Sequence, residues 1–259
     1  MQNVRDYWVG KNERAKVALH HTTEMANKYK DEIVASTKAT TVYNEFHVFP
    51  IHEKEFDTSI TVEDIDSVSA VMKEEAGNRM AVLNFASFKE PGGGFLAGSS
   101  AQEESLCHES FLYNVISQFQ EYYTNNCKAK NRALYKNRAL YSRDIVFEKE
   151  GKSKICDVIT CASPNLTAAR KYCNISDAAN TDVLVSRCDY VLDIAAEQGA
   201  DVVILGAFGC GVFGQNPIEV ATIFKDLLNN KYEGVFSKVV FAIPQGNNGN
   251  LDEFRKVFA

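Results

Sequence analysis

The sequence predicts an α/β protein in which helices cover both faces of a sheet. Several short segments are apolar almost throughout, among them 80–87, 154–165 and 237–244, and segments of helical character alternate with them. Strands that are apolar on both faces belong to sheets that are covered on both sides. The 259 residues, 45% of them hydrophobic, are enough to bury a large core. We therefore expect a layered α/β/α arrangement.

The first half of the chain begins with a helix predicted at residues 12–37, because good helix formers dominate there and no Gly or Pro interrupts them. Its apolar stripe consists of Ala15, Val17, Ala18 and Met25. The segments predicted next are extended stretches at 40–50 and 57–62, a helix at 64–76 that ends at Gly77, a buried strand at 80–87, and a helix at 102–123.

The second half predicts a strand at 154–165, a helix at 177–198 that stops at Gly199, a strand from 200 that leads into a glycine-rich loop, a strand at 237–244, and a last helix at 251–257. Asn216 can cap a further helix that runs to about Asn230, with Pro217 in its first turn. The hexamer KNRALY occurs twice in succession, at 130–135 and 136–141. We expect a polar surface segment there and assign no function to it.

The organisation of the chain is that of one compact unit, because no break in composition is large enough to be a linker. We expect residues 1–40 to form an N-terminal helical extension that packs on the core. Residues 41–259 then form the main domain.

Charge and cysteine content restrict the class of protein. The net charge of −6 argues against general binding to nucleic-acid phosphates, so an anionic ligand needs a local site. The cysteines are odd in number and form no CxxC pair, which predicts reduced thiols. The N-terminus lacks the apolar run of a signal peptide, and no run of 18 apolar residues predicts a membrane span. We therefore expect a cytoplasmic protein with neither membrane nor nucleic-acid partners.

Two glycine-rich loops each follow a predicted strand and precede a helix, which is where ligands bind in open α/β sheets. Neither loop fits GxxxxGK[ST], and neither fits the dinucleotide-binding GxGxxG pattern. The second loop, GAFGCGVFG, spaces its glycines so that backbone amides can close around an anion. The alternative, a tight turn that only packs, stays open.

The first loop places Gly92, Gly93 and Gly94 shortly before Glu103 and Glu104. Such a glycine run suggests that the backbone passes very close to another group. The alternative is local, because Ser100 to Glu103 fits a capping box and Glu103 would then only cap the helix. Glu104 is not explained by that box. Adjacent helical residues point about 100° apart, so the two carboxylates cannot form the facing pair of an ordinary glycosidase.

These motifs together resemble the poly(ADP-ribose) glycohydrolases of the microbial type. The resemblance rests on GGG followed after seven residues by QEE, and on LNFAS, PGGGFLAGSSAQEESL, VITCASPN and GAFGCGVFGQNP. It implies a macrodomain-like three-layer α/β/α sandwich with a mixed sheet. It also implies exo-type hydrolysis of the ribose–ribose O-glycosidic bonds of poly(ADP-ribose), which releases ADP-ribose. The expected partners are ADP-ribose, its polymer and ADP-ribosylated proteins.

The resemblance also assigns roles to individual residues. Glu104 would be the catalytic acid/base, Glu103 would hold the ribose hydroxyls, and Gln102 would lie in the same ribose site. The other substrate-binding residues would be Asn84, Ser87, Gly92, Gly93, Gly94, Phe208, Gly209, Cys210, Gly211, Val212 and Phe213. The second loop would wrap the diphosphate, and Phe213 would pack on the terminal ribose. Eukaryotic relatives carry Asp where this chain has Asn84, which places any acid role there in doubt.

The chemistry of ribosyl transfer agrees with these roles. An oxocarbenium-like transition state needs an acid that protonates the departing oxygen, and the same carboxylate can then accept a proton from water. That acid must be buried, or crowded by negative charge, to hold a proton near pH 7. No metal or other cofactor is expected, since the five histidines lack ligand spacing. Two alternatives remain: a non-catalytic ADP-ribose reader, and a hydrolase of mono-ADP-ribosylated protein or nucleic acid.

Overall fold

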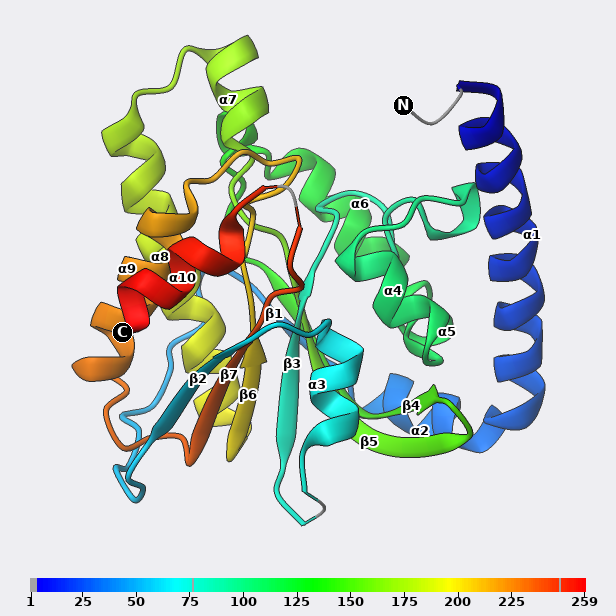
Figure 1. Cartoon of the computed structure of the whole chain (residues 1–259), viewed down its shortest axis with the longest axis horizontal. Coiled ribbons are helices and arrows are strands. Elements are labelled where there is room, and N and C mark those ends of the chain that lie inside the picture. The colour runs from blue at the N-terminus through cyan, green and yellow to red at the C-terminus, as the bar shows by residue number, and fades with distance from the viewer. Residues whose placement is uncertain (1–3, 76, 247) are drawn as a thin grey trace.

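The computed structural model describes residues 4–75, 77–246 and 248–259. Within these ranges its centre is a seven-stranded mixed sheet with the strand order β1-β4-β5-β3-β6-β7-β2 (Figure 1). Strand β4 pairs antiparallel with both β1 and β5, whereas the other neighbours are parallel. The strands are β1 (Thr41–Tyr43), β2 (Ser59–Glu63), β3 (Met80–Phe85), β4 (Ala139–Lys149), β5 (Lys152–Cys161), β6 (Val202–Leu205) and β7 (Lys238–Ala242).

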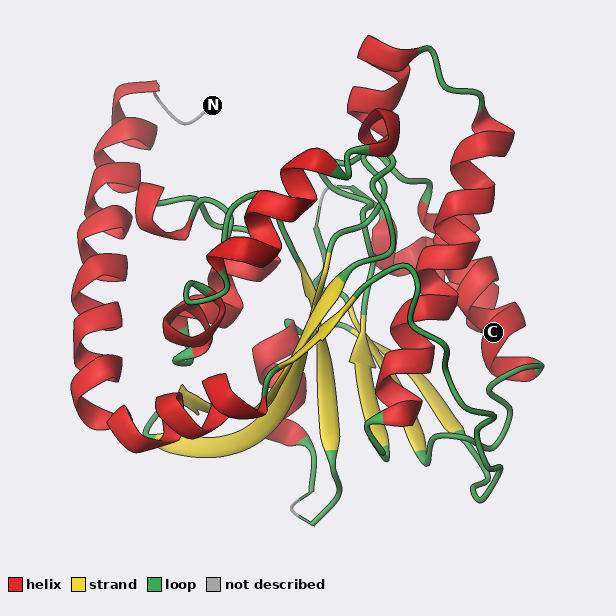
Figure 2. Cartoon of the chain, turned by 180° about the vertical axis from the view of Figure 1, so that it is seen from behind, coloured by secondary structure: helices red, strands yellow, loops and turns green. Residues whose placement is uncertain are grey.

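Helices cover both faces of this sheet (Figure 2). The α-helices are α1 (Val4–Lys28), α2 (Lys30–Ala39), α3 (Ser67–Lys73), α4 (Gln102–His108), α5 (Leu112–Ile116), α6 (Gln120–Lys128), α7 (Leu166–Cys173), α8 (Asp177–Glu197), α9 (Pro217–Asn229) and α10 (Asn250–Phe258). Two 3₁₀ turns, η1 (Phe95–Ala97) and η2 (Asn131–Ala133), interrupt the connecting loops. The expected three-layer α/β/α sandwich with a mixed sheet is confirmed.

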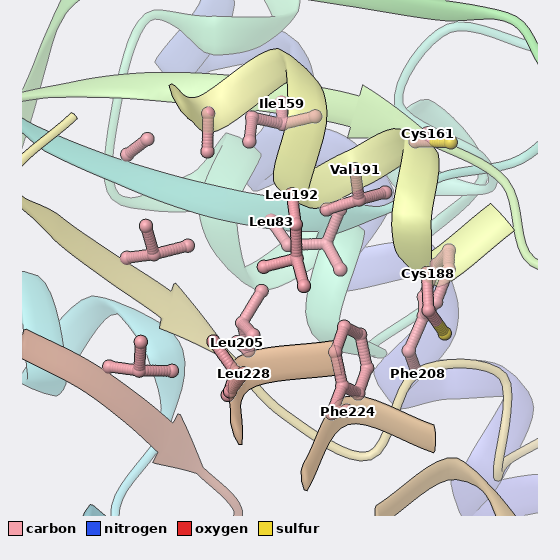
Figure 3. Close-up of a cluster of buried hydrophobic side chains, with 14 of the residues drawn as sticks. Leu83, Ile159, Cys161, Cys188, Val191, Leu192, Leu205, Phe208, Phe224 and Leu228 are labelled. Atoms are coloured by element: carbon pink, nitrogen blue, oxygen red, sulfur yellow. The ribbon is translucent and has the colours of Figure 1, made fainter. Parts of the chain in front are cut away.

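Two apolar cores, one on each face, hold the layers together. Strand residues such as Leu83 and Leu205 pack against Val191 of α8 and Phe224 of α9 on one face (Figure 3). On the other face the alternate residues of the strands pack against α3, α4 and α5. Because successive side chains of a strand point to opposite faces, strands buried on both sides must be apolar at every position. This explains the uninterrupted apolar runs of the sequence.

The N-terminal helices contact the core through only part of the predicted stripe. Ala18 and Met25 are buried, but Val17 is 57% exposed. The prediction of one helix at 12–37 was wrong in detail, because α1 ends at Lys28 and α2 begins at Lys30. Side-chain bonds between the helices and the rest of the chain include Asn114 Nδ2 to Thr22 O at 2.9 Å.

Several other boundaries differ from the prediction. The segment 40–50 contains only the short strand β1, and Val48 beyond it is 87% exposed. The helix predicted at 102–123 consists of α4, α5 and α6, because turns separate them. The helix predicted at 64–76 ends at Lys73, and Ala76 lies outside the described residues. Helix α7 was not predicted, although Asn165 caps it by accepting from Ala168 N at 2.9 Å.

The duplicated hexamer gives the largest correction. The first copy forms the turn around η2, but the second copy leads into β4, where Leu140 and Tyr141 are fully buried. The prediction of a polar surface segment was therefore wrong for the second copy, and in the first copy it holds only for residues 130–132, because Leu134 and Tyr135 are buried. Two predictions are confirmed in detail: Asn216 caps α9, and Pro217 is its first residue. Among the described residues, no helix combines the length and apolar character needed to cross a bilayer.

Candidate active site

A cleft of about 600 Å³ opens at the carboxyl ends of the central strands. Its lining comes from both glycine-rich loops, from the start of α4 and from the segments that follow β3 and β7. The parallel strands β3, β6 and β7 all end at this edge of the sheet, so the loops that follow them converge there. The volume lies in the range that is usual for small-molecule sites.

Glu103 lies at the base of the cleft and is only 4% exposed. Its Oε2 accepts a hydrogen bond from Ser87 N at 2.7 Å, and its Oε1 accepts from Asn84 Nδ2 at 3.3 Å. Burial raises the pKa of Glu103 to about 8, although the bonds from Ser87 and Asn84 act in the opposite direction. Burial thus favours the protonated form of Glu103 at neutral pH.

Glu104 is buried beside it and is held by backbone amides. Its Oε1 accepts from Gly94 N at 2.8 Å, and its Oε2 accepts from Ala101 N at 2.9 Å. The second bond is the reciprocal half of a capping box, since Ala101 is the N-cap and Glu104 is the third residue of α4. The interpretation of Glu103 as the capping residue is therefore wrong, because the helix begins one residue later than that box requires.

Gly93 explains why the glycine run and the carboxylates occur together. A Cβ atom built on Gly93 would lie 2.8 Å from Glu103 Oε2 and 2.8 Å from Glu104 Oε1. Its φ of +58° is also a conformation that disfavours any side chain. Both carboxylates thus lie against the bare backbone of this residue.

The neighbouring glycines, Gly92 and Gly94, are closely packed against other side chains. A Cβ on Gly92 would lie 2.8 Å from the Tyr113 ring, and one on Gly94 would overlap Ser99 Oγ. Gly92 and Gly94 themselves do not line the cleft; they pack behind it, whereas Gly93 faces it. The loop is therefore fixed on both sides of the carboxylates.

Gln102 uses its amide group within the protein. Its Oε1 accepts from Phe85 N at 2.9 Å, and its Nε2 donates to Leu83 O at 2.8 Å, which ties α4 to the end of β3. Asn84 is fully buried beneath this junction, and its Oδ1 has no hydrogen-bond partner among the described residues. Ser87 and Gln102 line the cleft, while Asn84 supports Glu103 from behind.

The second loop forms the opposite wall of the cleft. Phe208, Gly209, Gly211, Val212 and Phe213 line it, whereas Cys210 does not. Among the described residues, the backbone amides of Gly211, Val212 and Phe213 have no hydrogen-bond partner in the protein. Three consecutive free amides are suited to an anion. Gly209 is required by its φ of +78° and by close approach to Ser163 Oγ.

Cys210 has the properties of a packing residue rather than of a nucleophile. Burial raises the pKa of its thiol to about 12, so the thiolate is disfavoured at neutral pH. Metal coordination has no support in the geometry either, since no group of three His, Cys, Asp or Glu side chains in the described part of the chain is placed to hold an ion.

Sequence reasoning missed two kinds of residue at the site. Ser163 and Asn250 line the cleft from beyond the two glycine loops. Gln215 and Arg187 support it from behind: Gln215 Nε2 donates to Pro164 O at 2.8 Å, and the fully buried Arg187 donates to Ala162 O. The motif VITCASPN contains Ser163 and could have identified that residue. The others lie in segments without a local signal.

The fold and the site together define a macrodomain-type α/β protein with a carboxylate pair in a ligand cleft. A family model for the catalytic domain of microbial-type poly(ADP-ribose) glycohydrolases (PARG) matches residues 14–150, which is more than half of the chain. The chain belongs to this family. A comparison with curated protein sequences found no match.

Solved structures of this family are similar over most of the chain. The poly(ADP-ribose) glycohydrolase of Thermomonospora curvata is 26% identical with a TM-score of 0.87, and the match covers 96% of this chain and 100% of that one. The enzyme of Deinococcus radiodurans in complex with ADP-ribose is 29% identical with a TM-score of 0.80, over 87% of this chain and 96% of that one. The T. curvata enzyme bound to the inhibitor ADP-HPD is 26% identical with a TM-score of 0.82, over 95% and 99% respectively.

Proposed function

We propose that this protein hydrolyses the ribose–ribose O-glycosidic bonds of poly(ADP-ribose) and releases ADP-ribose. The observation that carries the proposal is the pair Glu103 and Glu104, which lines a cleft of suitable volume and lies against the backbone of Gly93. Membership of the family supports the reaction. The D. radiodurans structure contains ADP-ribose, which supports the ligand.

In this proposal the free amides of the second loop bind the diphosphate. The amides of Gly211, Val212 and Phe213 are directed to an anion because they have no other partner in the described structure. The distal ribose then lies between Phe213 and the first loop. This orientation places its anomeric carbon next to Glu104.

Glu104 acts as the general acid and then as the general base. It donates its proton to the ribose oxygen that departs, and the resulting carboxylate accepts a proton from the water that attacks the anomeric carbon. The two backbone bonds to its carboxyl group hold it in one position throughout. Glu103 binds the hydroxyls of the ribose.

The test compares Glu104→Gln with Glu121→Gln, an exposed residue of α6. We expect Glu104→Gln to lower kcat on the polymer at least about a thousandfold, because the proton donor is lost, while ADP-ribose affinity is retained. Glu121→Gln should behave like the wild type. Release of ADP-ribose by chromatography and affinity by calorimetry check both. Near-normal turnover by Glu104→Gln would contradict the assignment.

A panel of substrates distinguishes this function from the two alternative functions. A polymer, a mono-ADP-ribosylated protein and an ADP-ribosylated oligonucleotide are incubated with the same enzyme. We expect the polymer to be cleaved at its terminal units, with ADP-ribose as the first product. Cleavage confined to the link with the protein or the nucleic acid would contradict the proposal, and absence of all cleavage would indicate a reader.

We also infer that the protein acts on ADP-ribosylated proteins in a reducing compartment such as the cytoplasm. All seven cysteines are free, and four of them are buried. Persistent free thiols are typical of reducing compartments.

A further inference from the structure

A run of cations extends from the end of α6 to β4 and is not used by the proposed reaction. Between Glu121 and Asp144 the chain has no acidic residue and six basic ones, although its net charge is −6. Three of the six are exposed and, among the described residues, have no ion pair: Lys128, Lys130 and Arg132. We refer to these three as the basic patch.

The other three cations already have partners in the protein. Lys136 Nζ lies 2.7 Å from Glu45 Oε1, Arg138 Nε donates to Asn126 Oδ1 at 2.5 Å, and Arg143 donates to Gln198 Oε1. Only Lys136 is neutralised by an ion pair, while Arg138 and Arg143 are half-buried and held by amide oxygens. The basic patch is therefore the fully exposed part of the run.

The backbone that carries the patch is strained and tightly held. Asn131, Arg132, Ala133 and Tyr135 all have positive φ angles, between 40° and 67°, which side-chain-bearing residues rarely adopt. Such strain persists only where the surroundings fix it, and it concentrates at functional sites. Here the buried Arg187 holds the turn, because its NH2 group donates to Tyr135 O at 3.1 Å.

The same turn is joined to both walls of the cleft. The Tyr135 ring stacks on Phe88, with centroids 4.1 Å apart, and its centroid lies 6.2 Å from that of Phe213. Phe88 follows the Glu103-binding residue Ser87, and Phe213 lines the cleft beside Glu103. Figure 1 shows α6 and α7, which flank the turn in sequence, at the loop end of the sheet. The turn that carries the basic patch thus contacts the segment after β3 through Phe88 and the second glycine loop through Phe213.

We propose that the basic patch binds the pyrophosphates of the polymer units that lie beyond the unit in the cleft. The proposal rests on the proposed function, since it requires a substrate chain that continues past Glu104. Each ADP-ribose unit carries two negative charges, so a chain that leaves the cleft presents anions to these cations. Their attraction acts within about 8 Å at physiological salt, which confines the effect to the patch.

A sugar–pyrophosphate chain fits the patch better than a single-stranded nucleic acid does. Sites for single-stranded nucleic acid combine cations with exposed aromatic rings on which bases stack. The aromatic residues next to the patch, Phe88 and Tyr135, are buried and stack on each other instead. The chemistry available on the surface is therefore charge alone.

The test neutralises the patch with the substitutions Lys128→Gln, Lys130→Gln and Arg132→Gln in one protein. We expect KM for long polymer to rise about tenfold, because three exposed charge contacts are lost, while kcat and the affinity for ADP-ribose stay unchanged. The slope of log KM against log salt concentration should decrease by about 2. The matched control removes three other exposed cations, Lys30, Lys38 and Lys152, which lie outside the run and do not line the cleft.

Three results would overturn the proposal: an unchanged KM and salt slope, an equal rise in the control protein, or an equal loss of affinity for ADP-ribose itself. An oligonucleotide that binds as tightly as the polymer, and loses affinity in the same variant, would make the patch a nucleic-acid site instead. Equilibrium binding of the polymer to Glu104→Gln, with and without the patch, tests the surface separately from catalysis. If the wild type released no ADP-ribose, this measurement would still decide the role of the patch.

Discussion

At the scale of single residues, the site depends on the absence of a side chain at Gly93. Two carboxyl oxygens lie only 2.8 Å from the position that its Cβ would take, and each carboxyl group also has its own backbone donor. The position of the carboxylates is therefore set by the main chain, which varies less than side-chain rotamers do. Two predictions follow from the geometry at this scale.

We expect Gly93→Ala to lower kcat at least about a hundredfold, because the methyl group displaces both carboxylates and small displacements at a reacting centre are costly. The matched control is Gly151→Ala. Gly151 has a similar positive φ of +75°, but no atom lies within 4 Å of its Cβ position. Both variants share the cost of a side chain at positive φ, about 1–2 kcal/mol, and Gly93→Ala should lose more because of the steric overlap, measured by denaturant unfolding. Equal activity of the two variants would refute the explanation.

A second prediction concerns pH. The pKa of Glu103 is about 8 in the folded protein and near 4.5 when exposed, so the unfolded protein loses this proton first. The stability contribution of Glu103 is therefore present below pH 4.5 and is lost as pH rises to 8, by at most about 1.4 kcal/mol per pH unit. Glu103→Gln removes this dependence. The Tm of the variant minus that of the wild type should increase from pH 5 to pH 8, measured by calorimetry; a constant difference would contradict it.

At the scale of elements, helix α1 packs against the first glycine-rich loop on the side away from the cleft. Arg14 Nε donates to Gly98 O at 2.8 Å, and the backbone of α1 at Lys11 passes so close to Gly98 that no side chain fits there. Gly98 closes the 3₁₀ turn η1, whose preceding residue Gly94 donates to Glu104. A continuous set of contacts therefore connects α1 with the proposed acid.

We expect Arg14→Met to lower kcat about tenfold, because the first glycine loop loses its hydrogen bond to α1. The affinity for ADP-ribose should change little, because the second glycine loop, which binds the diphosphate, is not affected. Arg14→Lys should restore part of the activity. Lys16→Met is the control, since Lys16 lies on the same helix and bonds only to Glu13. Steady-state kinetics on the polymer measures all three. A parallel rise in KM and loss of ADP-ribose affinity would show that α1 acts on binding instead.

At the scale of the whole molecule, the sequence predicted the layers well because the same pattern, an apolar strand followed by a helix or a turn, occurs several times. The buried parts of β3, β5, β6 and β7 are mostly apolar, and each strand is followed by a helix or a loop with turn residues. The glycine loops could be placed at the strand ends for the same reason. The pairing of β4 with β1 and β5 was missed, since an antiparallel strand that follows a basic turn carries no such pattern.

The duplicated hexamer shows why the remainder could not be predicted. In one copy Tyr135 has a φ of +61° and belongs to a strained turn, while in the other Tyr141 is in a buried strand and bonds to Asp157 at 2.6 Å. The six letters are identical, so the difference comes from distant groups such as Arg187, which no local window contains. The orphan Asn84 Oδ1 and the N-cap at Ala101 were beyond prediction for the same reason.

The Tyr135 ring, which stacks on Phe88 and meets Phe213 edge to face, has a consequence for how the cleft exchanges its contents. The segment after β3 and the second glycine loop are not independent of each other, because the Tyr135 ring contacts an aromatic side chain of each. Displacement of either segment would disturb the ring packing that the other segment shares. A substitution of Tyr135 would therefore affect both the side on which a chain end enters and the side that holds the sugar nucleotide.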